Sequence, residues 1–88
     1  MHKIKFASEQ VKKQFDKLPI SVFKQADKVI ISLTKNPFPE GVKKLKSLGD
    51  FYRIRISDFR VIYKINHKNQ EIIIMRVKHR KDVYKHFP

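Results

Sequence analysis

The spacing of the apolar residues changes once along the chain, and this change limits the fold more than any other feature of the sequence. Up to about residue 36, apolar residues recur every three or four positions, as Val11, Phe15 and Leu18 do, which is the pattern of amphipathic helices. From residue 52 onward, apolar and polar residues alternate, which is the pattern of strands with one buried face. Helices followed by a run of strands predict a fold of the α+β class.

Two helices are expected in the first part of the chain. Ser8 has the side chain of an N-cap and predicts a helix that runs from there to Leu18. Pro19 is well placed to begin a second helix. Asn36-Pro37 stops that helix, because proline disfavours helical geometry in the residue before it. The short joint between the two helices predicts an antiparallel helical hairpin.

The strand patterns predict one sheet with the element order β-α-α-β-β-β. The expected strands are residues 2–6, 52–56, 59–65 and 71–78. The last of them is nearly all apolar in its first half, as a central strand covered on both faces would be. We therefore expect a small sheet of about four strands, with the N-terminal helical hairpin packed on one face. Because helices separate the first strand from the others, a sheet with both parallel and antiparallel strands is possible. Residues 1–88 are expected to form a single domain.

The charge of the chain indicates a polyanionic partner. There are 21 lysines and arginines against 8 carboxylates, which gives a formal net charge of +13. Such an imbalance is typical of proteins that bind nucleic acid, an acidic protein or an anionic surface. The absence of cysteine fits a reducing compartment. No secretory signal and no apolar run of about 20 residues is present, so we expect a cytoplasmic protein with no membrane contact.

The five arginines all lie between positions 53 and 80. Arginine grips phosphate with a planar fork and stacks on bases, which lysine cannot do. Alternation places Arg53, Arg55 and Arg60 on one face of two neighbouring strands, with Arg76 and Arg80 nearby. A solvated polar face is the alternative, although such a face uses lysine and threonine as readily as arginine. The expected RNA-binding residues are Lys43, Lys44, Lys46, Arg76, Lys78 and Lys81.

Two further side chains are candidates for chemistry. His79 lies between Lys78 and Arg80, whose charges favour the neutral imidazole that a general base requires. Tyr84 follows this basic run and could stack on an unpaired base, although packing at a chain end is an equal alternative. The carboxylates are not paired, the histidines lack the spacing of zinc ligands, and no Gly-rich phosphate loop exists. If the protein is an enzyme, we therefore expect it to need no metal or cofactor.

Three segments together resemble a known family. They are YRIRI at 52–56, FRVIY at 59–63 and HRKDVY at 79–84. They resemble the RelE/ParE superfamily of toxins from bacterial type II toxin–antitoxin pairs, and the RelE branch most closely. The resemblance covers almost the whole chain, including the tract Lys44-Leu45-Lys46. It implies an endoribonuclease that cleaves messenger RNA, commonly in the ribosomal A site, and thereby inhibits translation. The implied reaction is attack by the RNA's own 2′-hydroxyl on the adjacent phosphate.

The resemblance also implies roles for single residues. Arg60 and Arg80 match the phosphate-stabilising residues, and Tyr84 matches the aromatic residue that stacks on a base. Arg53 and Arg55 occupy positions where some relatives carry lysine. Because arginine stays charged, neither can act as a general base. His79 or Tyr84 would then take the proton, or catalysis rests on orientation and charge stabilisation alone.

The family also implies a partner and leaves two rival functions open. An acidic antitoxin, encoded by an adjacent reading frame, is expected to neutralise the toxin, and operator DNA would be reached only through that antitoxin. The first rival is the ParE branch, which poisons DNA gyrase by contact and cuts no RNA. The second is a non-catalytic basic domain, whose affinity for RNA or DNA would fall steeply with salt while no product formed.

Overall fold

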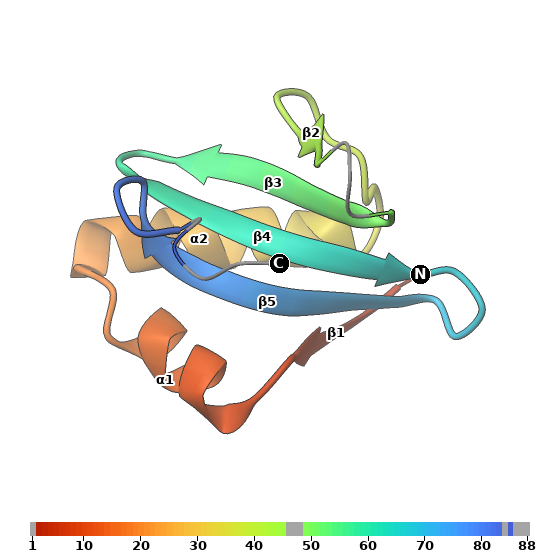
Figure 1. The fold of residues 1–88 in the computed structure, drawn as a ribbon, viewed down its shortest axis with the longest axis horizontal. Coiled ribbons are helices and arrows are strands. Elements are labelled where there is room, and N and C mark those ends of the chain that lie inside the picture. Colours follow the sequence, from red (N-terminus) through yellow and green to blue (C-terminus); the bar gives the residue numbers. More distant parts are fainter. Residues whose placement is uncertain (1, 46–48, 84, 86–88) are drawn as a thin grey trace.

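The computed structural model describes residues 2–45, 49–83 and 85 of the chain, and these form one sheet and two helices (Figure 1). The elements are β1 (Lys3–Phe6), α1 (Glu9–Asp16), α2 (Ile20–Leu33), β2 (Lys43–Lys44), β3 (Phe51–Ile56), β4 (Phe59–Asn66) and β5 (Glu71–His79). The α+β class and the order of the predicted elements are confirmed. The strand order in the sheet is β1-β5-β4-β3-β2. The described sheet therefore has one strand more than predicted, the additional strand being β2, which pairs with β3.

The helix boundaries follow the local sequence signals. Ser8 caps α1, and its Oγ accepts a hydrogen bond of 3.3 Å from the backbone N–H of Val11. Pro19 precedes α2, as predicted, and Thr34 caps the other end of that helix, where its Oγ1 donates to the carbonyl of Ile31 at 2.7 Å. α2 therefore ends before Asn36-Pro37, the pair that was expected to stop it. In the described part of the chain, neither helix is long and apolar enough to cross a membrane.

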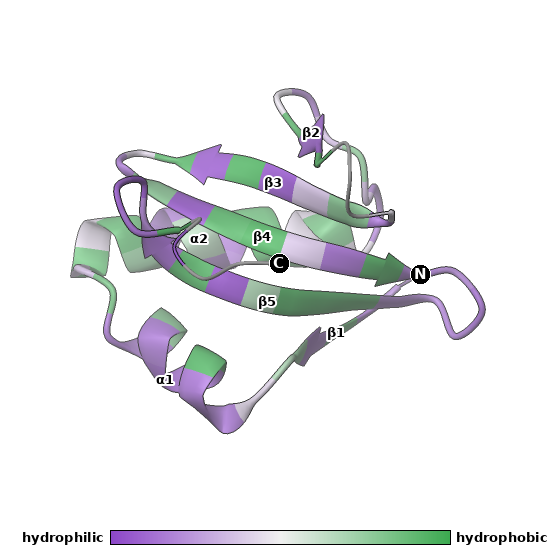
Figure 2. Cartoon of the chain, in the orientation of Figure 1, coloured by the Kyte–Doolittle hydropathy of each residue, from purple (hydrophilic) through white to green (hydrophobic). Residues whose placement is uncertain are grey.

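The sheet is mixed. β1 runs parallel to β5, with Lys3 opposite Glu71 and Phe6 opposite Ile74. The other neighbouring strands are antiparallel. β5 therefore lies between β1 and β4, and the continuous green of its first half in Figure 2 shows the apolar run that such a central strand requires.

The main core lies between the sheet and α2, which crosses one face of the sheet (Figure 1). Every second residue of β3 and β4 points into this core, and Tyr63 in β4 is fully buried. α1 lies against β5 and joins the core through Phe15. The ring of Phe15 lies 5.5 Å from that of Phe6 in β1 and 4.9 Å from that of Phe23 in α2, measured between centroids. Aromatic contacts thus connect the two helices and the first strand.

A β-bulge in β5 decides which of its residues face the core. Ile62 lies opposite Arg76, but the next residue of β4, Tyr63, lies opposite Ile74, so Met75 is an extra residue in β5. With strict alternation, Arg76 would follow Ile74 into the core. The extra residue reverses the parity, so Arg76 faces away from α2 and Val77 is buried instead. The bulge therefore keeps the charge of Arg76 out of the core.

Tyr63 connects the sheet to the segment that follows α2. Its hydroxyl donates a hydrogen bond of 2.7 Å to the carbonyl oxygen of Pro37. Burial, with a smaller contribution from Tyr52, raises the pKa of the Tyr63 phenol well above its usual range. The phenol therefore stays protonated and remains a donor at any physiological pH.

The variant Tyr63→Phe is expected to lower the free energy of unfolding by about 1–2 kcal/mol, because the Pro37 carbonyl loses its buried donor. Urea denaturation measures the change. Tyr52→Phe is the matched control, since it keeps the aromatic pair, whose centroids are 5.8 Å apart. Equal losses of stability in the two variants would contradict the importance of the Tyr63 hydrogen bond.

Candidate nucleic-acid interface

The face of the sheet opposite α2 carries cations in two transverse rows. In the first row, Arg55 of β3 lies opposite Arg60 of β4, which lies opposite Lys78 of β5. In the second row, Lys43 lies opposite Arg53. Neighbouring strands are only about 4.8 Å apart, so these positive charges are close together. We call the residues of this surface the cationic face; they are Lys43, Arg53, Arg55, Arg60 and Lys78.

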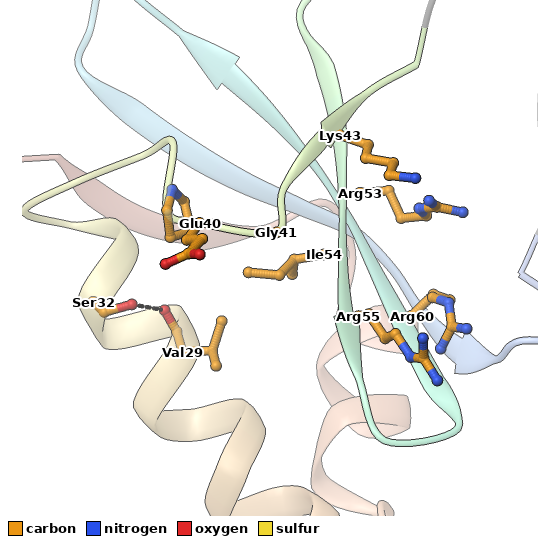
Figure 3. Close-up of a pocket in the computed structure, with 10 residues that line it drawn as sticks. Val29, Ser32, Glu40, Gly41, Lys43, Arg53, Ile54, Arg55 and Arg60 are labelled. Atoms are coloured by element: carbon orange, nitrogen blue, oxygen red, sulfur yellow. Dashed lines mark hydrogen bonds between the residues drawn. The ribbon is translucent and has the colours of Figure 1, made fainter.

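Figure 3 shows the β3 side of the cationic face, where the side chains of Lys43, Arg53, Arg55 and Arg60 project to the same side of the sheet. Ile54, between Arg53 and Arg55 in sequence, points the other way, toward Val29 of α2 (Figure 3). A cavity of about 510 Å³ lies at this edge of the sheet. Arg53, Arg55 and Arg60 line it from the sheet, and residues of α2 and of the segment after α2 line it from the other side. The predicted alternation of β3 and the gathering of its arginines with Arg60 are thus observed.

Arg60 is held in place by the turn that joins β3 to β4. Its Nη1 donates to the carbonyl of Ser57 at 3.1 Å and to the carbonyl of Phe59 at 3.0 Å. Ser57 adopts the left-handed conformation, with φ of 55°, in the turn between β3 and β4. The turn therefore fixes the guanidinium before any ligand arrives, and a cation that is already oriented needs no reorganisation to stabilise an anion.

The segment after β5, residues 80–83 and 85, folds back over the cationic side of the sheet in a series of turns (Figure 1). The backbone N–H of Arg80 donates to the carbonyl of Asp58 at 2.8 Å. Arg76 Nη1 donates to the carbonyl of Val83 at 3.0 Å and also to that of Lys85. Ile62, which points away from α2, and Val83 are both fully buried. Arg76, expected to contact RNA, thus holds the C-terminal segment against the sheet.

Arg80 and Lys81 are both exposed in this segment. The carboxylate of Asp82 is occupied nearby: Lys85 Nζ lies 3.1 Å from it, and this hydrogen bond and charge lower the pKa of Asp82. Among the described residues, no three histidine, cysteine or carboxylate side chains gather as a metal site would require. The surface around Arg80 therefore has a positive character.

Two of the predicted residues lie apart from the cationic face. His79 lies opposite Phe59, in the row that faces α2, and the two rings meet edge to face at 5.6 Å. Its Nδ1 accepts a hydrogen bond of 3.2 Å from the backbone N–H of Lys81. Lys44 lies opposite Tyr52, so it too belongs to the row of residues on the side of the sheet that faces α2. Strand alternation is the reason, since residues adjacent in sequence point to opposite faces. Tyr84 and Lys46 lie outside the described residues.

Sequence reasoning missed the contacts that orient the site. The carbonyls of Ser57 and Phe59 that hold Arg60 are backbone groups, which no side-chain pattern reveals. The contact of Arg76 with the C-terminal segment depends on the β-bulge. The one usable signal was Val83, an apolar residue within a charged run, which indicates that this run packs against something.

These features define a basic α+β domain with one helix-covered face and one face that can hold a polyanion. Residues 5–84 match the family model described as the ParE toxin of the type II toxin–antitoxin system parDE. The chain is 35% identical over 80 residues to the putative toxin RelE1 of Methanocaldococcus jannaschii, covering 88% of this chain and 89% of that protein. The chain belongs to the RelE/ParE superfamily of type II toxin–antitoxin toxins and is RelE-like, which confirms the resemblance seen in the sequence.

Solved structures agree with this assignment. A chain of the archaeal RelE–RelB complex from Pyrococcus horikoshii OT3 is 32% identical, with a TM-score of 0.79 over 93% of this chain and 98% of that one. The isolated Escherichia coli RelE toxin is 23% identical and has a TM-score of 0.80 over 90% of this chain and 84% of its own. The likeness to the E. coli toxin shows the shared fold, with two helices and a mixed sheet.

Proposed function

We propose that this toxin is an endoribonuclease that cleaves messenger RNA on the ribosome and thereby stops translation in the cytoplasm. The observation that carries the proposal is the row of Arg55, Arg60 and Lys78, in which Arg60 is already oriented by the β3–β4 turn. A phosphate that passes to its transition state gains negative charge on its oxygens. Stabilisation of that charge by fixed cations is usually the largest single term in such catalysis.

In the proposed reaction, the 2′-oxygen of the RNA forms a bond to phosphorus and the bond from phosphorus to the 5′-oxygen breaks. The 2′-hydroxyl loses its proton and the leaving 5′-oxygen gains one, so the products are a 2′,3′-cyclic phosphate and a 5′-hydroxyl. Arg60 and Arg80 are the proposed partners of the phosphate oxygens, with Arg80 toward the leaving group. Arg53 and Arg55 hold the neighbouring phosphates and align the 2′-oxygen with the bond that breaks.

In this proposal, His79 is not the general base that takes the proton from the 2′-hydroxyl. His79 lies in the row that faces α2, while Arg60 and Lys78 lie on the other side of the sheet. A general base contributes about 10²–10⁴-fold to a rate. We expect His79→Ala to lower single-turnover cleavage by less than about tenfold, measured with a radiolabelled RNA. A loss of about 10³-fold in a folded variant would instead identify His79 as the base.

An acidic antitoxin is the proposed protein partner. The similar solved structures include RelE–RelB complexes from Pyrococcus horikoshii OT3 and from Methanococcus jannaschii, the latter 26% identical with a TM-score of 0.76. The net charge of +13 suits an acidic protein that covers the cationic face. Operator DNA would be bound through this antitoxin rather than by the toxin itself.

A ParE-like gyrase poison is the second candidate function, favoured by the description of the family model that matches residues 5–84. A toxin that acts by protein contact has no need of several arginines on one face of its sheet. The rows of the cationic face therefore favour RNA cleavage over gyrase binding.

The experiment that tests the proposal is cleavage of a defined messenger RNA, with and without programmed ribosomes, in the presence of EDTA. We expect cuts that survive EDTA, carry 5′-hydroxyl ends and disappear in the double variant Arg60→Ala, Arg80→Ala. Cuts seen only with ribosomes would establish the ribosomal substrate. A protein that still arrests growth but cuts no RNA under any of these conditions would overturn the proposal in favour of gyrase.

A further inference from the structure

A second, smaller pocket lies at the edge of the sheet where α1 lies beside β5. β1 pairs only with Glu71–Ile74, the first part of β5, so α1 is the neighbour of the strand beyond that point (Figure 1). The pocket has a volume of about 180 Å³. Its lining residues are Gln10, Val11 and Gln14 of α1 and Met75, Arg76 and Lys78 of β5.

Gln14 has a buried acceptor that the described part of the protein leaves without a donor. Its Oε1 is shielded from solvent and has no hydrogen-bond partner, and it is the single side-chain oxygen or nitrogen with this property among the described residues. An unsatisfied buried acceptor costs about 1–3 kcal/mol, so native proteins rarely keep one without a reason. Because Gln14 also lines the pocket, a rotation of its amide toward a ligand that donates a hydrogen bond there would supply such a reason.

Lys78 connects this pocket to the cationic face. It closes the row that contains Arg55 and Arg60, and it also lines the pocket. A phosphate bound along that row therefore has a neighbouring nucleotide within reach of the pocket. Met75, the extra residue of the β-bulge, also lines the pocket, and its polarisable thioether can contact the ring of a base.

The chemistry of the amide limits the ligand. A glutamine side chain presents one acceptor and two donors at its tip, which matches a base edge that carries a donor beside an acceptor. The pairing of glutamine with adenine, through N6 and N7, is the standard example. RNA-cleaving proteins can read bases in this way because unpaired bases leave their edges accessible.

We propose that the pocket between α1 and β5 binds one unpaired base next to the phosphate that is cut, and that Gln14 reads this base, with adenine as the expected base. The inference rests on the proposed ribonuclease function and adds a residue that determines sequence preference. Arg60 and Arg80 act on the phosphate, which is the same in every nucleotide, so they cannot supply such a preference.

The test is cleavage of an RNA pool in which each position near the cut contains all four bases. The wild type is expected to favour adenine at one position by about 5- to 150-fold, the discrimination of one bidentate base contact. Gln14→Ala is expected to bring this preference to within about twofold. Gln25→Ala, on an exposed glutamine of α2, is the matched control and should keep the wild-type profile. A wild-type profile in Gln14→Ala, or no preference in the wild type, would overturn the proposal.

A binding measurement separates failure of this proposal from failure of the proposed function. The probes are the dinucleotides ApA and UpU with 2′-O-methyl groups, which cannot be cut. In the wild type, ApA is expected to shift the NMR signals of the Gln14 side-chain amide and the Met75 methyl group, and UpU is not. If the protein cuts no RNA but ApA still shifts these signals, the pocket stands without the ribonuclease. Shifts confined to the cationic face, or equal with both probes, would overturn the pocket.

Discussion

Replacing Arg60 by alanine is expected to lower single-turnover RNA cleavage by about 10²–10³-fold, the cost of removing one oriented donor from a developing oxyanion. Arg60 lies in the middle of the row formed with Arg55 and Lys78, and the carbonyls of the β3–β4 turn orient its guanidinium. Arg60→Lys keeps the charge but loses the planar fork, so we expect it to recover only part of the rate. Quenched-flow or manual time courses with a labelled RNA measure all three proteins.

Lys64→Ala is the matched control for Arg60. Lys64 is an exposed cation of the same strand and the same face, opposite Phe51, but it lies outside both rows of the cationic face. We expect cleavage by Lys64→Ala to stay within about threefold of the wild type, since one surface charge contributes little. Equal losses in Arg60→Ala and Lys64→Ala would mean that total charge, rather than the oriented row, supports the activity. Thermal unfolding of each variant shows that the fold is retained.

Replacing Arg76 by alanine is expected to release the C-terminal segment and to slow cleavage by about 10- to 100-fold. Hydrogen bonds from a charged donor contribute about 1.5–3 kcal/mol each, and Arg76 makes two of them, to the carbonyls of Val83 and Lys85. Without them, the segment that carries Arg80 is held less firmly beside the β3–β4 turn, by the hydrogen bond from the Arg80 backbone N–H to Asp58 and by the packing of Val83. Trypsin cuts after Arg80 and Lys81, so the initial rate of cutting at these two sites measures the release directly.

The two readouts for Arg76 have different meanings. Faster cutting by trypsin in Arg76→Ala, with RNA cleavage reduced mainly in kcat, identifies Arg76 as a residue that positions the C-terminal segment. A change in KM alone, with unchanged cutting by trypsin, would identify Arg76 as an RNA contact, as the sequence suggested. Arg76→Lys keeps the charge but loses the rigid planar guanidinium, so we expect it to protect Arg80 and Lys81 only in part.

Local sequence patterns were enough to predict most of the fold. The alternation in β3 and β4 and the N-cap at Ser8 are short-range features, and each appears where it was expected. β2 was missed because a strand of two residues, Lys43–Lys44, is too short to show a period. The ends of both helices came earlier than predicted, since the last turn of a helix depends on tertiary packing as well as on its sequence.

The candidate site was predicted in part. The sequence placed Arg53, Arg55 and Arg60 on one face, because parity along two adjacent strands is visible in the sequence alone. It grouped His79 with them by proximity along the chain, although alternation puts His79 on the other face from Lys78. Neither the β-bulge nor the hydrogen bonds of Arg76 could be predicted, because both depend on how two strands pair rather than on the pattern within one.

The parallel pairing of β1 with β5 has a consequence for how the toxin is made. β1 is the first strand to leave the ribosome and β5 is the last, and β5 is the neighbour of β1 in the sheet. Ile4 and Phe6 therefore have no strand partner during synthesis until β5 has emerged, and such contacts between distant parts of a chain form slowly. Lys78 and Arg80 belong to that same late part of the chain. β5 thus completes both the sheet and the cationic face, and a chain interrupted before β5 has neither in complete form.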